Sequence, residues 1–345
     1  MKATFEEKQN LLRGGLLALL ILLLPLFFQN KYYISLFVVV GIHSLVVLGL
    51  TLFMGFAGQV SLGHAAFYGI GAYITGVLST KFGFPVMASF LLAIGGTGFI
   101  ALVIAYPILK IKGFYLGMAT LGFAEIVYIF LNQTGGLTGG GTGLGNIPRI
   151  SISGVVFDSD MKYYYFVWLL FFVLFIFSMN FLSSRIGRAL RAIHEDEMAA
   201  ETMGINVARY KTMVFVLSAI YAGLAGALYA HYVSFLSPGI CSLMFNVIII
   251  AMVVIGGSGS IWGALLGTVL LTLVPEYLVY FQDYEPLVYG LMIIGIVMFS
   301  PQGLVGLLDR LWTSVSAAFS HRGCRIAKRP DGKEMLDSFG RKDGL

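Results

Sequence analysis

Long apolar stretches separated by short polar ones recur along the whole sequence. With a window of about 20 residues, the length that crosses a bilayer, this pattern predicts ten transmembrane helices with soft boundaries. Glycine clusters interrupt the third and ninth of them. We therefore expect an all-α, polytopic membrane protein with some broken or re-entrant segments. The predicted spans are 11–28, 33–53, 62–80, 86–108, 113–131, 162–182, 212–233, 242–257, 260–278 and 285–300.

The composition supports this class. Of 345 residues, 58% are hydrophobic and 11% are charged, whereas a soluble domain has about 25% charged residues. The first apolar run follows Lys2, Lys8 and Arg13, as a signal peptide would. It ends in "QNKYY" without a small-residue cleavage site, so we expect a retained first helix. Cys241 and Cys324 are far apart and predict neither a disulfide framework nor a zinc site.

The basic residues are unevenly divided between the two predicted sides. Ten spans place both termini on one side, which then carries 18 of the 22 Lys and Arg residues. The positive-inside rule makes that side cytoplasmic, and eight spans plus re-entrant segments fit nearly as well. We divide the chain into a transmembrane domain, residues 1–308, with a cytoplasmic loop at 183–211, and a basic cytoplasmic tail, residues 309–345. The net charge of +5 suits lipid headgroups better than nucleic acid.

Several kinds of chemistry have no support in the sequence. The Gly332-Lys333 pair lacks the leading glycine of a P-loop and is followed by Glu334, so the chain has no ATP site of its own. The glycine-rich stretch 134–146 contains no lysine and is expected to be an external loop. No catalytic triad, paired carboxylates or metal-binding spacing is present. We expect a protein that is not an enzyme and holds no cofactor.

Two glycine-interrupted segments carry candidate pathway residues. The stretch 55–73 reads "GFAGQVSLGHAAFYGIGAY", and the segment 255–267, "IGGSGSIWGALLG", loosely mirrors it. Such breaks in two halves suggest a central transport pathway, while glycines four residues apart also permit close helix packing. Glu125 is an acid within the predicted span 113–131, which makes it a functional candidate. Alternatively, it could lie near an interface or bond Tyr128. The candidates are Gln59, Ser61, His64, Glu125, Gly257 and Ser258; His43 and Asn246 are expected to be packing partners.

The loop 183–211 predicts a short helix outside the membrane, near Asp196–Met203. Acidic residues favour a helix N-terminus, alanines favour the helix interior, and a following glycine can end it. The residues concerned are Glu195, Asp196, Glu197, Ala199, Ala200 and Gly204. Ile205, just beyond the glycine, can pack against the last turn of this helix. Arg185, Arg188 and Arg191 precede it at three-residue steps, on one helix face. A solvated surface helix that anchors the loop to headgroups is the alternative interpretation.

Five collinear motifs within residues 33–308 carry a family resemblance. The loop and following span, "GRALRAIHEDEMAAETMGINVARYKTMVFVLSAIYAGLAGALYA", resemble the coupling loop of branched-chain amino-acid ABC transporter permeases of the LivM type. The stretch 55–73, "GGLTGGGTGLGNIPR", "VIGGSGSIWGALLGT" and "SPQGLVGLL" are similar to other motifs of that family. The broader permease signature has Glu-Ala-Ala, three residues, then Gly; here Met198 stands at the Glu position and Glu197 comes one residue early.

The resemblance implies a role and a set of partners. This chain would pair with a second homologous permease subunit, two ATP-binding cassette subunits that bind ATP, and a periplasmic or extracellular substrate-binding protein, in a prokaryotic plasma membrane. The short helix would dock on an ATPase subunit, and the substrates would be leucine, isoleucine and valine. Urea or short amides are the nearest alternative substrates. An ion-coupled carrier is the alternative from another class, but it would be expected to bury more charges than Glu125.

Overall fold

The computed structural model describes residues 30–152, 155–157 and 159–277, with shorter pieces at 21, 23–25, 287, 290–291, 294–295, 298 and 303–306. The chain divides into two compact units, Met1–Val305 and Gly306–Leu345, and the architecture given below is that of the first. Most of the predicted spans 11–28 and 285–300, and all of the predicted tail 309–345, lie outside the described residues.

Eight of the predicted spans correspond to observed helices. They are α2 (Lys31–Thr51, continued by the π-helix η1, Leu52–Phe56), α3 (His64–Thr80), α4 (Val86–Ile108), α5 (Phe114–Gln133), α7 (Asp160–Ser183), α10 (Val207–Val233), α11 (Leu243–Gly256) and α12 (Ile261–Tyr277). Five helical segments in the described residues are long and apolar enough to cross a membrane, namely α2 with η1, α4, α5, α7 and α10. The total of ten spans and the cytoplasmic placement of the termini stay predictions.

The connections contain short elements that the apolar pattern does not predict. They are α6 (Gly135–Thr138), η2 (Gly140–Thr142), β1 (Ser151–Ile152), β2 (Val155–Val156), α8 (Arg185–Glu195), α9 (Glu197–Thr202) and the 3-10 turn η3 (Pro238–Cys241). Strands β1 and β2 form an antiparallel pair only two residues long. This pair departs from the all-α chain that was expected, and it lies between α5 and α7.

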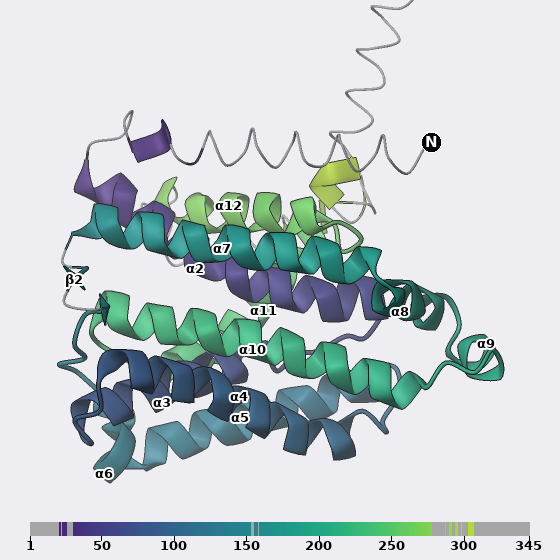
Figure 1. Ribbon diagram of the computed structural model, residues 1–345, viewed down its shortest axis with the longest axis horizontal. Coiled ribbons are helices and arrows are strands. Elements are labelled where there is room, and N and C mark those ends of the chain that lie inside the picture. The colour runs from purple at the N-terminus through teal and green to yellow at the C-terminus, as the bar shows by residue number, and fades with distance from the viewer. Residues whose placement is uncertain are drawn as a thin grey trace, which may run out of the picture. The chain divides into compact units, whose positions relative to one another are not determined.

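Small residues let the central helices approach closely. Helices α3 and α10 pack along most of their length, with Gly71 directly against Gly223 and Gly226 against the carbonyl group of Tyr68. Helix α2 is largely buried, because α7, α10 and α12 all pack on it. Figure 1 shows α4 and α5 on the far side of α10 from α7. Without a hydrophobic driving force between helices in lipid, such close packing holds the bundle together.

The two ends of the bundle differ in character (Figure 1). At one end, α8 and α9 project beyond the long helices, and Lys112 and Lys211 approach Glu197 there. At the other end, the glycine-rich connection folds over α3 and α10: Leu144 pairs with Leu236, and the Lys81 ammonium bonds the Gly136 carbonyl. These contacts agree with the predicted division of loops between two sides.

Candidate functional site

The chain leaves helical conformation between α2 and α3, as the sequence predicts. Helix α2 first loosens into the π-helix Leu52–Phe56, a rare form that often marks functional positions. The residues from Ala57 to Gly63 are then largely non-helical. The backbone amide of Gln59 donates to the Phe53 carbonyl at 3.3 Å. We call Ala57–Gly63 the α2–α3 break.

Two of the predicted pathway residues, Ser61 and His64, lie together at this break and are buried. Ser61 is 0% exposed and His64 is 1% exposed. The Ser61 hydroxyl lies 3.1 Å from His64 Nδ1, and His64 Nε2 bonds the hydroxyl of Ser218 in α10. In this conformation their polar atoms therefore satisfy one another and fasten the break to α10.

Backbone groups around the break are held by side chains from two further helices. The Leu62 amide donates to the Thr120 hydroxyl of α5 at 2.9 Å. The Ala65 amide, in the first turn of α3, donates to the Asn246 side-chain oxygen of α11 at 2.9 Å. First-turn amides have no partner within their own helix, so Asn246 caps α3 from outside. Asn246 is thus a packing partner, as expected.

The two glycine-rich segments meet in space. Gly55 lies directly against the carbonyl oxygen of Ser258, and a Cβ atom at Gly63 would be 2.7 Å from the Thr120 carbonyl oxygen. The later segment joins α11 to α12, where Gly257 adopts a φ of +109°. The expected close approach is confirmed at these positions. Gly259, by contrast, has open space where a side chain would project.

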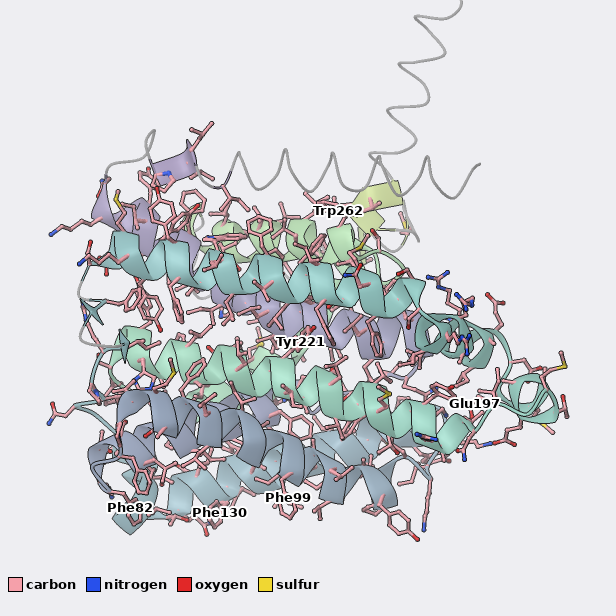
Figure 2. The ribbon with its side chains drawn as sticks, in the orientation of Figure 1. Phe82, Phe99, Phe130, Glu197, Tyr221 and Trp262 are labelled. Atoms are coloured by element: carbon pink, nitrogen blue, oxygen red, sulfur yellow. The ribbon has the colours of Figure 1, made fainter. Side chains whose placement is uncertain are left out.

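The structure does not bring Glu125 to this cluster. The residue is exposed on α5, and among the described residues it makes no hydrogen bond or ion pair with Tyr128 or any other residue. Its neighbours Ile126 and Phe130 are 67% and 58% exposed, and Figure 2 shows Phe130 on the outer surface of the bundle. Glu125 therefore lies on an exposed, largely apolar face of α5.

The predicted short helix outside the spans is confirmed as α9. Asp196 caps it, because its side-chain oxygen accepts from the amides of Met198 at 2.8 Å and Ala199 at 3.1 Å. Gly204 follows the last turn with a φ of +82°. The Ile205 amide then donates to the Ala200 carbonyl at 3.1 Å, which completes a Schellman ending.

Helix α9 is buried along one side. Ala200 is buried in a small apolar cluster with Ile193 of α8 and Val207 of α10. Met198 in α9 is 73% exposed, and Met203, which follows the last residue of α9, is 83% exposed. The helix thus packs on the α8–α10 corner through Ala200 and leaves both methionines exposed, on different sides of the helix.

Glu197 joins α9 to three other parts of the chain. Its Oε1 atom accepts from Gln59 Nε2 at 3.1 Å and from Lys211 Nζ, and its Oε2 atom lies 3.7 Å from Lys112 Nζ. Burial alone would raise the pKa of Glu197. The hydrogen bond and charge of Lys211 outweigh burial, with help from Gln59 and Lys112, so this pKa lies below its ordinary value. The carboxylate is therefore charged at neutral pH.

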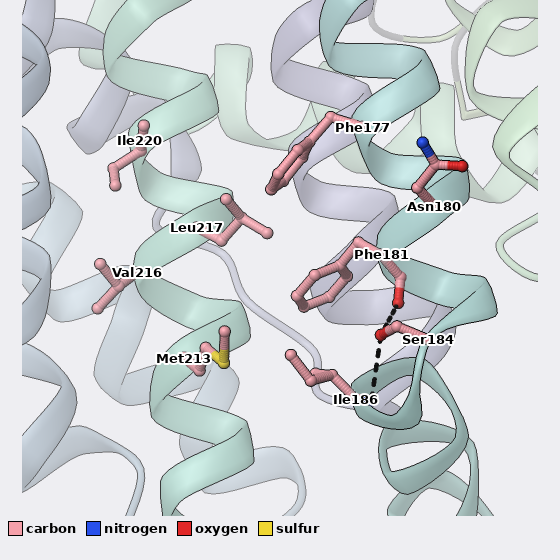
Figure 3. Close-up of a pocket in the computed structure, with 9 residues that line it drawn as sticks. All are labelled: Phe177, Asn180, Phe181, Ser184, Ile186, Met213, Val216, Leu217 and Ile220. Atoms are coloured by element: carbon pink, nitrogen blue, oxygen red, sulfur yellow. Dashed lines mark hydrogen bonds between the residues drawn. The ribbon is translucent and has the colours of Figure 1, made fainter.

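Two cavities lie elsewhere in the bundle. An apolar groove of about 490 Å³ lies between α7 and α10 and is lined by Phe177, Asn180, Phe181, Ser184, Ile186, Met213, Val216, Leu217 and Ile220 (Figure 3). A second cavity, of about 390 Å³, lies among α2, α10, α11 and α12 and is lined in part by His43 and Thr272. His43 Nδ1 and Thr272 Oγ1 have no hydrogen-bond partner, and the His43 ring packs against Phe245 with the ring centroids 5.5 Å apart.

Sequence reasoning missed Lys211 and Lys112 as partners of Glu197, and Ser218 as the partner of His64. A usable signal exists for Lys211, because a lysine in the first turns of an otherwise apolar helix needs a nearby acid. Glu197 precedes it by 14 residues. No comparable signal exists for Gln59, which is 138 residues from Glu197.

Long apolar helices, the α2–α3 break and a short helix outside the spans that contacts this break are typical of a polytopic helical membrane protein. Residues 32–299 match the family described as "Branched-chain amino acid transport system / permease component". The chain belongs to this family, which confirms the resemblance stated from its motifs.

The curated relatives are also permeases. The chain is 32% identical, over 76% of its length and 68% of the relative's, to the high-affinity branched-chain amino acid transport system permease protein LivM of Salmonella typhimurium. It is 26% identical to the permease protein LivH of the same organism, over 76% of this chain and 91% of the relative. It is 24% identical to a probable LivM of Methanocaldococcus jannaschii, over 69% of each chain. No solved structure matches.

Proposed function

We propose that this chain is one permease subunit of an ATP-driven ABC importer for leucine, isoleucine and valine in a prokaryotic plasma membrane. A second, homologous permease subunit completes the translocation pathway. Two separate ATP-binding cassette subunits bind and hydrolyse ATP on the cytoplasmic side, and a periplasmic or extracellular binding protein delivers the substrate. The chain itself carries out no covalent chemistry and holds no cofactor.

The observation that carries this proposal is the contact between Gln59 and Glu197 at 3.1 Å. It ties α9, the helix outside the spans, to the α2–α3 break inside the bundle. ATP-driven closure of the ATPase pair would move α9, and α9 would move the break. ATP would thereby shift the pathway between inward-open and outward-open populations, because it binds these states with different affinity.

The exposed residues of α9 support docking on a protein partner. Met198 and Met203 are apolar and largely exposed, and methionine adapts well to a partner's surface. The loop residues Glu195, Asp196, Glu197, Ala199, Ala200 and Gly204 build the helix that presents them. In this proposal an ATPase subunit contacts α9 through its exposed residues, which include Met198.

The pathway assignment of Gln59, Ser61, His64, Glu125, Gly257 and Ser258 remains part of the proposal. Ser61 and His64 are buried and bonded to each other in this conformation, so they can face a substrate only after the break rearranges. Glu125 is exposed and can reach the pathway only where α5 borders the second permease subunit. The binding protein would supply much of the selectivity.

The test is uptake of labelled leucine into vesicles that contain this chain with the ATPase, second permease and binding-protein components of its own transport system. We expect uptake that needs ATP and is competed by valine and isoleucine but not by urea. Competition by urea alone would instead support the short-amide alternative. Uptake driven by an ion gradient without ATPase subunits would overturn the importer proposal in favour of an ion-coupled carrier.

A further inference from the structure

The coupling loop of this chain has its acidic residue turned inward. At the position where the broader permease signature has Glu, this chain has Met198, which is exposed. Glu197, one residue earlier, has a side chain only 22% exposed and directs Oε1 at Gln59 and Lys211. Glu197 is thus in contact with the permease itself, while Met198, Glu201 and Met203 are exposed.

Glu197 is held in this orientation by Lys211. The Lys211 side chain is 3% exposed and Glu197 is its ion-pair partner. Removing one member of a buried ion pair leaves the other charge uncompensated and is strongly destabilising. If the Glu197 side chain turned toward another subunit, the buried Lys211 ammonium of α10 would therefore be left without its ion-pair partner.

The α2–α3 break also lies against the end of α8, just before α9. A Cβ atom at Gly58 would be 3.2 Å from the His194 ring of α8. Between α8 and α9, Asp196 is extended, with φ −157° and ψ 116°, so the two helices are separated by a bend. The bend and the break therefore touch through Gly58 and through the Gln59–Glu197 hydrogen bond.

We propose that Glu197 is a positioning residue that transmits the movement of α9 to the α2–α3 break through Gln59. This inference rests on the proposed function. It assigns Gln59 to transmission, at the end of the bundle where α9 lies.

The decisive variant is Gln59→Leu in the intact reconstituted transporter. Leucine is close to glutamine in size and leaves the Glu197–Lys211 pair in place, so the chain should fold and retain its ATPase subunits. A hydrogen bond to a charged group shifts an equilibrium by about tenfold or more. We expect the number of ATP molecules hydrolysed per leucine imported to rise by about that factor. The apparent Tm should fall only slightly, because the side chain also loses its hydrogen bond to the Ala57 carbonyl. Gln133→Leu, at an exposed glutamine that ends α5, is the matched control and should leave the ratio unchanged.

A second pair of substitutions tests the acid itself. Glu197→Leu with Lys211→Met removes both charges together, so no buried charge is left alone. We expect the same rise in ATP per leucine, and adding Gln59→Leu should then have no further effect, since residues that act through one contact are non-additive. Met198→Ser with Met203→Ser should instead weaken retention of the ATPase subunits.

The outcomes separate this inference from the proposed function. If wild-type vesicles import leucine only with ATP, and Gln59→Leu raises the ATP cost with its ATPase subunits retained, transmission through Gln59 is supported. A normal ATP cost in Gln59→Leu overturns the inference and leaves the importer proposal intact. Loss of the ATPase subunits from Gln59→Leu also overturns it, because the contact would then serve docking. If the wild type shows no ATP-dependent uptake, the proposed function itself fails.

Discussion

Gly226 of α10 lies so close to the carbonyl oxygen of Tyr68 in α3 that a Cβ atom at Gly226 would overlap that oxygen. The neighbouring pair of Gly71 and Gly223 makes a similar backbone contact between the same two helices. Helices α3 and α10 also carry His64 and Ser218, which are bonded to each other. The position of the break relative to α10 therefore depends on this glycine-lined crossing.

Gly226→Val is expected to separate α3 from α10. Forcing extra carbon atoms into a packed contact costs about 1–3 kcal/mol, and here the atom in the way is a backbone carbonyl oxygen that cannot rotate aside. The apparent Tm of the purified chain should fall, and uptake should fall with it. Thermal unfolding in detergent, followed by the loss of the monodisperse chromatographic peak, measures the first effect.

Gly122→Val is the matched control for this prediction. Gly122 lies on the exposed side of α5, and nothing is within 4 Å of the position that its Cβ would occupy. Its apparent Tm should equal that of the wild type or exceed it, because glycine is a poor helix former. An equal fall in apparent Tm in both variants would show that the loss of stability does not come from the close contact between α3 and α10.

Gly204→Val should uncouple ATP hydrolysis from uptake while leaving the membrane helices inserted. Gly204 has a φ of +82° and ends α9. A side chain there costs about 1–2 kcal/mol, and a β-branched one is worse. Because the six-residue helix depends on its caps, we expect α9 to lose its fixed orientation. The ratio of ATP hydrolysed to leucine imported measures this in vesicles.

The Gly204→Asn variant supplies the control, since asparagine tolerates the left-handed conformation. It should retain most of the coupling that valine loses. If valine at this position couples normally, the loop does not act through the geometry of α9, and its role as a coupling helix would be refuted.

Ser61→Leu and Gly63→Leu are each expected to block uptake, since both sites lie in a packed part of the break. Ser61 is 0% exposed, and Gly63 lies against the Thr120 backbone. Ser61→Ala is the more informative change, because it removes the two hydrogen bonds of this hydroxyl, with the Gly63 amide and with His64 Nδ1, each worth about 1 kcal/mol, without adding volume. If Ser61 only packs, the KM for leucine should be unchanged. A KM raised severalfold in Ser61→Ala would instead show direct contact with the substrate.

The helices were predictable because the bilayer imposes a simple length and polarity rule. The apolar runs at 86–108 and 113–131 became α4 and α5 with small shifts. Helix α9 was predictable for a different reason: its start at Asp196 and its end at Gly204 are set by local capping, which depends on residues a few positions apart. Both kinds of signal are contained in a short stretch of sequence.

The contacts that define the site were not predictable in this way. Gln59 was assigned to the pathway from its place in a broken helix, and its partner Glu197 was assigned to the coupling loop; nothing local joins them across 138 residues. The exposure of Glu125 could not be predicted either. Helix α5 is apolar on most of its circumference, so its periodicity does not separate a buried side from an exposed one. Pairing between distant helices depends on packing that a single sequence does not encode locally.

Thr75→Val should loosen the glycine-rich connection at the end of the bundle away from α9. His231 of α10 is 0% exposed; its Nδ1 atom donates to the Pro148 carbonyl at 2.6 Å, and its Nε2 atom lies 2.8 Å from the Thr75 hydroxyl. In the neutral ring Nε2 must then accept from Thr75. Valine has the same shape and leaves this buried nitrogen unsatisfied, at a cost of about 1–3 kcal/mol.

We expect faster amide hydrogen exchange in residues 144–148 of the Thr75→Val variant, because His231 joins that segment to α3. Thr80→Val is the matched control: the Thr80 hydroxyl bonds the Gly76 carbonyl of its own helix, so its loss should leave exchange in residues 144–148 unchanged.

Since the connection would lie on the side where a binding protein delivers substrate, Thr75→Val should also raise the binding-protein concentration that gives half-maximal uptake. Wild-type exchange in Thr75→Val would show that His231 holds the connection through Pro148 alone.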